Sequence, residues 1–156
     1  MTAEFSKLNL RDDFDDVLGT ADAKRWQLSM PTDLEVVVSL SSAAVPAEAF
    51  EARLLWNRYP DEAPSLKFRD RGTGRLDMPQ AWPLIRGFRP QSLDACVNWC
   101  KEGLAIHPEW RADPRFAWDK SHNPLLRVLR TLQDEFDNFY LGRFKCTHFS
   151  RRLRLG

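Results

Sequence analysis

Three cysteines are the residues of this chain best suited to covalent chemistry: Cys96, Cys100 and Cys146. A cysteine attacks a carbonyl carbon as its thiolate, and acyl transfer then needs a donor for the developing oxyanion. Asn98 lies two residues after Cys96, and His107 follows in the next loop. Asn98 offers an amide N–H to an oxyanion, and His107 offers a ring nitrogen for proton transfer. Cys96, Asn98 and His107 are therefore the candidate catalytic residues.

Other interpretations of these residues remain open. Residues 92–104 are expected to form a helix that places Cys96 and Cys100 on one apolar stripe, and free cysteines are among the most buried residue types. Cys100, one helical turn later, is the alternative nucleophile. Cys96 and His107 also suit a hydrolase, since the same pair can transfer an acyl group to water. The cysteine spacing matches no Cys-x-x-Cys pair, so neither a metal nor a cofactor is expected.

Length and composition predict one globular domain. The chain has 156 residues, of which 43% are hydrophobic and 29% charged, and this composition is typical of folded domains. No apolar run approaches the roughly 20 residues that span a bilayer, and no secretory signal precedes the domain, so a cytoplasmic protein is expected. The formal net charge is only +1. A basic tail starts at about residue 145 and is interpreted as a solvated terminus, so a nucleic-acid partner is not expected.

Hydrophobic periodicity predicts an α+β fold that begins with a helix and continues with a sheet. The spacing of apolar residues over 5–18 is typical of an amphipathic helix. Residues 26–30, 34–40 and 50–56 alternate or are rich in β-branched side chains, as strands are. Residues 65–68 are expected to add a short fourth strand. Because the connections are short, we expect an antiparallel meander of three to four strands.

The second half of the chain is expected to be irregular before it ends in helices. Glycines and prolines over residues 69–87 disfavour regular structure and predict the most mobile segment. Trp110 and Trp118 are expected to anchor the loop that holds them. Asn123 and Pro124 are typical of a helix start. The packing face of this C-terminal helix is predicted to contain Leu125, Val128, Leu129, Leu132, Phe136 and Phe139.

Several short motifs accompany these elements. They are the third strand at 50–56, the corner Tyr59-Pro60, the run Pro64-Ser65-Leu66-Lys67-Phe68, and the segments Phe88-Arg89-Pro90 and His107-Pro108-Glu109-Trp110. On these residues the chain resembles the ubiquitin-conjugating enzyme family, and specifically its divergent bacterial branch. The resemblance covers residues 5–144, and the order of helix, meander, proline corner, cysteine-bearing segment and packing helices is that of the UBC-like fold.

The resemblance implies a single UBC-like domain over residues 1–156 that carries a ubiquitin-like protein as a thioester on Cys96. An activating enzyme would supply the modifier, an amine would receive it, and a deconjugating peptidase from the same operon is a further expected partner. The His-Pro-Asn triplet that precedes the cysteine in this family is absent, since His107-Pro108 follows Cys96. Asn98 or backbone N–H groups near Cys96 must then stabilise the oxyanion. The alternative is a catalytically inactive binding module or scaffold of the same fold.

Overall fold

The computed structural model describes residues 2–146 and begins with the predicted helix. Helix α1 (Ala3–Leu18) starts at Thr2, whose side chain accepts a hydrogen bond from the Phe5 N–H at 3.5 Å, and it ends at Gly19. A side-chain cap of this kind satisfies a backbone donor that the first turn leaves free. The predicted helix is confirmed, but its apolar pattern is only partly so, because Phe5, Leu8 and Leu18 are exposed. The large apolar side chains that α1 buries are spaced by three and four residues. They are Leu10, Phe14 and Val17.

Four strands form one antiparallel sheet in the order β1-β2-β3-β4, so the predicted meander is confirmed with all four members. Successive side chains of a strand point to opposite faces. Phe50, Ala52 and Leu54 of β3 accordingly enter the core, while Glu51 and Arg53 lie on the other face and are half-buried. The strands are β1 (Gln27–Thr32), β2 (Glu35–Leu40), β3 (Phe50–Leu55) and β4 (Ser65–Arg69).

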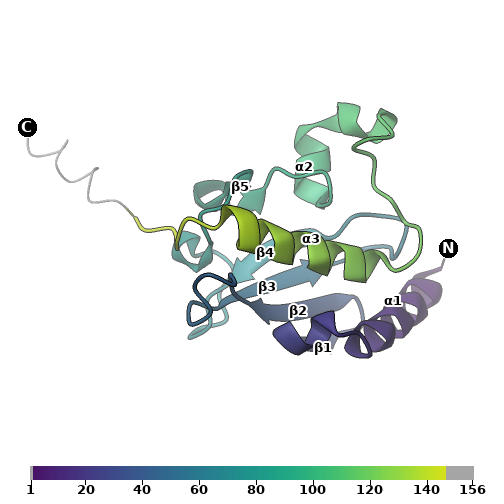
Figure 1. The fold of residues 1–156 in the computed structure, drawn as a ribbon. Coiled ribbons are helices and arrows are strands. Elements are labelled where there is room, and N and C mark those ends of the chain that lie inside the picture. Colours follow the sequence, from purple (N-terminus) through teal and green to yellow (C-terminus); the bar gives the residue numbers. More distant parts are fainter. Residues whose placement is uncertain (1, 147–156) are drawn as a thin grey trace, which may run out of the picture.

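Helix α3 (Pro124–Phe139) lies across the apolar face of this sheet (Figure 1). The Asn123 side chain accepts the Leu126 N–H at 2.9 Å, which confirms the predicted cap. Phe139 departs from the predicted face: it is 37% exposed, and the Arg86 guanidinium lies 3.5 Å above its ring. The rest of the predicted stripe is buried, as expected: Leu125, Val128, Leu129, Leu132 and Phe136.

The proline corner between β3 and β4 fastens both helices to the sheet through Tyr59. This side chain is fully buried, its hydroxyl donates to the Asp13 carboxylate of α1, and it accepts the Leu125 N–H of α3 at 3.1 Å. Burial, reinforced by the bond to Asp13, raises the pKa of Tyr59, so the hydroxyl keeps its proton. The corner is therefore a junction between three elements.

The segment after β4 is irregular, as predicted, but its second half is anchored to the core. Trp82 is fully buried and packs its ring against Phe68 of β4 at a centroid distance of 4.9 Å. Backbone hydrogen bonds then tie residues 82–84 to residues 141–144: Leu84 N–H to Gly142 O at 2.7 Å, Leu141 N–H to Leu84 O at 2.9 Å, and Phe144 N–H to Trp82 O at 2.9 Å. The expected mobility of residues 69–87 stays a prediction.

The helix predicted over residues 92–104 is wrong in its first two thirds. A short 3-10 turn, η3 (Pro90–Ser92), leads through Leu93 in the left-handed region (φ 56°) into strand β6 (Asp94–Ala95). Only α2 (Lys101–Ile106) is helical. Two members of the apolar stripe that suggested a helix, Cys100 and Leu104, do enter the core, but Cys100 reaches it from the loop before α2 and Leu104 from α2 itself. Leu93 and Cys96 are only half-buried.

Among residues 2–146, no helix combines the length and the apolar character that crossing a membrane would require. The basic tail predicted from about residue 145 falls almost entirely outside the described residues. Arg151, Arg152 and Arg154 belong to it.

Candidate functional site

A two-stranded hairpin presents Cys96 at the surface. Strand β5 (Phe88–Arg89) pairs antiparallel with β6, and the ladder extends one step further, because the Cys96 N–H donates to Gly87 O at 2.7 Å. Phe88 and its partner Ala95 are buried on the inner face. Alternation along the strands then turns Arg89 and Cys96 outward. The hairpin thus fixes the cysteine through its backbone.

Only one of the two cysteines near this hairpin can be reached. Cys96 is partly exposed, whereas Cys100 is completely buried. Burial raises the pKa of the Cys100 thiol well above its ordinary value, with a smaller contribution from Glu102, so Cys100 stays protonated and inert. Cys146 is exposed and accepts a hydrogen bond from the Gln80 amide at 3.0 Å. Of the two candidate nucleophiles, the geometry favours Cys96.

The other two candidate catalytic residues make contacts of their own. The Asn98 side chain donates to Phe116 O at 3.1 Å, which holds the loop after Cys96 to the loop before α3. His107 Nδ1 lies 2.8 Å from Glu109 Oε1, and its ring stacks on Trp110 at 4.3 Å. Within residues 2–146 no hydrogen bond joins either side chain to the Cys96 thiol. Their assistance to Cys96 stays a prediction, and the structure gives Asn98 a visible role in positioning the loop.

Sequence reasoning missed Gly103, which allows α2 to approach the Cys96 loop closely. A Cβ atom built on Gly103 would lie 1.9 Å from Val97 O and 2.5 Å from Val97 N. Those are backbone atoms, so no side-chain rotation could relieve the overlap. A glycine inside an expected helix is itself a signal, because it is unfavourable there unless a close contact requires it.

Arg89 is a second residue that sequence reasoning did not single out. Arg89 Nε and Nη2 each lie 2.7 Å from an oxygen of Asp94, the cross-strand partner, in a bidentate pair. The hydrogen bonds that Arg89 donates to Asp94 chiefly raise the pKa of its guanidinium. Arg89 is therefore held as a cation beside Asp94 on the outer face of the hairpin.

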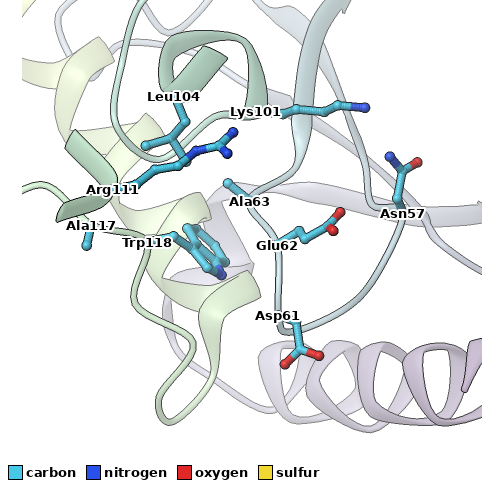
Figure 2. A pocket seen from close by; sticks show the side chains of 9 residues that line it. All are labelled: Asn57, Asp61, Glu62, Ala63, Lys101, Leu104, Arg111, Ala117 and Trp118. Atoms are coloured by element: carbon cyan, nitrogen blue, oxygen red, sulfur yellow. The ribbon is translucent and has the colours of Figure 1, made fainter. Parts of the chain in front are cut away.

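An open pocket of about 570 Å³ lies beside the proline corner, in the size range of ligand sites. Trp118 forms part of its wall and donates its indole N–H to Pro60 O at 2.8 Å, as expected of a loop anchor. Figure 2 shows Arg111 and Trp118 on one side and Glu62 on the other. The side chains that line it are Asn57, Asp61, Glu62, Ala63, Lys101, Leu104, Arg111, Ala117 and Trp118.

The acidic side chains around this pocket form salt bridges, whereas two of its basic side chains do not. Asp61 pairs with Lys120 at 3.4 Å, and Glu62 pairs with Arg58 at 3.3 Å. Among the described residues no acid pairs with Lys101 or Arg111 across a salt bridge. The pocket therefore combines apolar side chains with two cations that no acid of the described residues neutralises.

No group of three or more histidine, cysteine or acidic side chains in the described part of the chain could hold a metal ion. In comparisons with known proteins, no family model, no curated protein and no solved structure matches the chain.

Proposed function

We propose that this chain is a ubiquitin-conjugating-enzyme-like carrier that accepts a ubiquitin-like protein on Cys96. The observation that carries the proposal is the partly exposed Cys96 at the end of β6, next to a Cys100 that is completely buried. The order of α1, a four-stranded antiparallel meander, a Tyr-Pro corner, a cysteine-bearing segment and α3 supports it, because this is the order of the family that the sequence resembles.

The reaction on Cys96 exchanges one thioester for another. The Cys96 thiolate attacks the carbonyl carbon of the modifier's terminal thioester on the activating enzyme, and the carbonyl oxygen takes the electron pair. Collapse of this intermediate expels the enzyme's thiolate, which takes up a proton from water, and leaves the modifier on Cys96. An amine then attacks the new thioester, which releases the Cys96 thiolate and forms an amide. The cytoplasmic compartment expected from the sequence would keep the thiol reduced.

Cys96 has the first requirement for this reaction, which is access. His107, hydrogen-bonded to Glu109, is assigned to proton transfer from the incoming amine. Asn98 is assigned a positioning role, because its amide already holds the loop after Cys96 to Phe116 O. Glu109 keeps the pKa of its carboxyl low through a hydrogen bond with its own backbone N–H and through His107, so it stays ionised beside the ring.

A binding module without catalysis is the second candidate, and the pocket beside Trp118 favours it. Lys101 and Arg111, unpaired within residues 2–146, would bind acidic groups of a partner enzyme or of a ubiquitin-like protein. The apolar side chains around Leu104 would take a neighbouring hydrophobic side chain. Such a protein would use the pocket and leave Cys96 uncharged.

A charging assay separates the two candidates. The protein is incubated with ATP and with a cognate activating enzyme and ubiquitin-like protein, and the products are resolved with and without reductant. We expect a reductant-sensitive adduct with the wild type, a more reductant-resistant ester with Cys96→Ser, and no adduct with Cys96→Ala. Cys146→Ser is the matched control and should charge like the wild type. A wild type that binds the modifier but never charges would establish the binding module instead.

A further inference from the structure

The outer face of the β5–β6 hairpin carries the Arg89 guanidinium and the Cys96 thiol on neighbouring positions. Arg89 and Asp94 are cross-strand partners, and Cys96 lies two residues after Asp94 on the same face. Diagonal neighbours on one face of an antiparallel pair lie within reach of long side chains, and Arg89 is the diagonal neighbour of Cys96. Directly opposite Cys96 stands Gly87, which has no side chain and adopts φ +80°.

Gly87 is required by the backbone at this point of the hairpin. Its positive φ would strain any other residue, and a Cβ atom there would contact Cys96 O and the Val97 side chain, both at 3.4 Å. Neither atom belongs to the Cys96 side chain. The outer face of the hairpin thus carries a thiol and a guanidinium.

The guanidinium of Arg89 has N–H groups that its ion pair with Asp94 does not use. Arginine carries five N–H groups, and the bidentate pair with Asp94 uses one on Nε and one on Nη2. The other N–H groups, on Nη1 and Nη2, have no protein partner among residues 2–146. Asp94 is mostly buried, with a side chain 15% exposed, so it holds the guanidinium in one orientation while the free N–H groups point away from it.

We propose that Arg89 is the oxyanion donor of this site and a catalytic residue in its own right. The inference rests on the proposed function, because it names the group that stabilises the tetrahedral intermediate on Cys96. When the thiolate bonds to the carbonyl carbon, the oxygen gains the electron pair of the broken π bond, and the free N–H groups of Arg89 donate to it. The negative charge disappears again when the donor thiolate leaves.

Arg89 takes the place of the oxyanion donor that is missing from this chain together with the His-Pro-Asn triplet. Asn98 is less suited to the role, because its amide nitrogen is bound to Phe116 O at 3.1 Å. Arg89 brings a full positive charge instead of an amide dipole, and charge-assisted hydrogen bonds are roughly twice as strong as neutral ones. Asp94 is then a positioning residue that acts through Arg89.

The test compares two reactions of Cys96 that differ only in whether an oxyanion forms. Acyl transfer from a small-molecule peptide thioester passes through a tetrahedral oxyanion, whereas alkylation by iodoacetamide displaces iodide and forms none. Both rates are measured by intact mass in a Cys146→Ser background, which leaves Cys96 as the reachable thiol. Arg89→Gln is compared with Arg89→Lys, with Asp94→Asn, and with Arg86→Gln as the control for a nearby exposed arginine.

We expect Arg89→Gln to slow acyl transfer about 10- to 100-fold, less than a fully buried oxyanion donor would because the guanidinium is partly solvated. Alkylation should stay within about twofold, since no oxyanion forms. Arg89→Lys should recover part of the loss. Asp94→Asn breaks the ion pair but keeps the guanidinium, so its acyl transfer should stay within about fivefold of the wild type.

Two outcomes would overturn the inference. Equal slowing of acyl transfer and alkylation would mean that Arg89 acts on the thiol or on the hairpin. If it acts on the hairpin through the ion pair, Asp94→Asn would match Arg89→Gln. No change in either rate would remove Arg89 from the reaction. Neither measurement needs an activating enzyme or a modifier. If the wild type fails the charging assay but Arg89→Gln slows acyl transfer selectively, the proposed function is refuted and the role of Arg89 as oxyanion donor stands. If the wild type charges but Arg89→Gln changes neither rate, the proposed function stands and the role of Arg89 is refuted.

Discussion

The sheet with α3 and the segment over residues 70–123 are stabilised in different ways. In the first region, regular ladders satisfy the backbone and a continuous apolar layer fills the space between sheet and helix. In the second, the regular elements are short, and single side chains hold the irregular stretches between them: the Trp82 ring, the Asn98 amide and the Trp118 indole each fasten one stretch. The first region should keep its shape when one contact is lost, because many others remain. Each irregular stretch of the second region depends on one or two contacts.

This difference assigns separate tasks to the two regions. A layer of many small contacts is well suited to supporting a site, because no one contact decides its geometry. An irregular segment that is fixed at a few contacts can expose a thiol at the surface next to particular side chains. Cys96 belongs to the second region, while Cys100, only four residues later, already belongs to the buried layer.

Replacing a buried leucine of α3 by alanine should have the largest effect on stability. Leu132 is fully buried against the sheet, so Leu132→Ala should lower the free energy of unfolding by about 2–5 kcal/mol through lost contacts and a new cavity. Leu129→Ala should cost a similar amount. Leu141, which is 83% exposed, provides the control, and Leu141→Ala should change stability by less than about 0.5 kcal/mol. Urea melts measure all three, and equal small losses would mean that the layered core is misassigned.

Adding a methyl group at Gly103, where α2 contacts the loop after Cys96, should lower the free energy of unfolding less than the leucine substitutions do. It should also alter the site. A methyl group on Gly103 would meet Val97 backbone atoms, so Gly103→Ala should lower the free energy of unfolding by about 1–3 kcal/mol. The displaced loop should also change the alkylation rate of Cys96. Gly19→Ala is the matched control, since its Cβ would meet nothing closer than 3.5 Å. If Gly103→Ala were as stable and as reactive as the wild type, the second region would not depend on close contacts.

The same difference explains what the sequence could predict. Alternation in 50–56 and the Asn123-Pro124 cap are local signals, and both identified their elements correctly. The β5–β6 hairpin has no comparable local signal, because each strand is two residues long. Its position depends on Phe88, whose ring lies 5.9 Å from that of Phe68 and 6.2 Å from that of Trp82. Such contacts between distant residues override a helical stripe, which is why the predicted helix over 92–104 was wrong.

The candidate site was predictable to a similar degree. A cysteine can be found by residue type, and Cys96 is reachable in the structure as the nucleophile requires. The part played by Arg89 depends on cross-strand register, which no spacing in the sequence reveals. The anchoring of Asn98 to Phe116 depends on two loops that meet only in the folded chain.

A smaller effect should appear at the acidic end of the pH range, in the first region. Asp137 accepts hydrogen bonds from Arg25, from the Ala43 N–H and from Gln133. These contacts, chiefly the one with Arg25, lower the pKa of Asp137 in the folded chain. A lowered carboxyl pKa contributes stability above the unfolded value of about 3.9, and that stability is lost as the pH falls through the folded pKa.

Asp137→Asn should therefore cost about 1 kcal/mol at pH 7, a modest amount because the Arg25 side chain is nearly half exposed to solvent. The difference between wild type and variant should shrink as the pH falls below about 4, because the unfolded Asp137 then takes up a proton, whereas the folded Asp137 does so only at its lower pKa. Urea melts at pH 7 and pH 3 measure it. A difference that stays constant between the two pH values would show that the charge of Asp137 contributes nothing.

The most direct test of the account locates the modifier on the wild-type chain. After incubation with the activating enzyme, the ubiquitin-like protein and ATP, the intact mass is recorded and the modified peptide is identified without reductant. The account predicts one modifier per chain, attached to Cys96 and released by reductant, with Cys100 unmodified because it is buried. A modifier on Cys100 or Cys146, or a chain that stays unmodified while its partners are active, would contradict it.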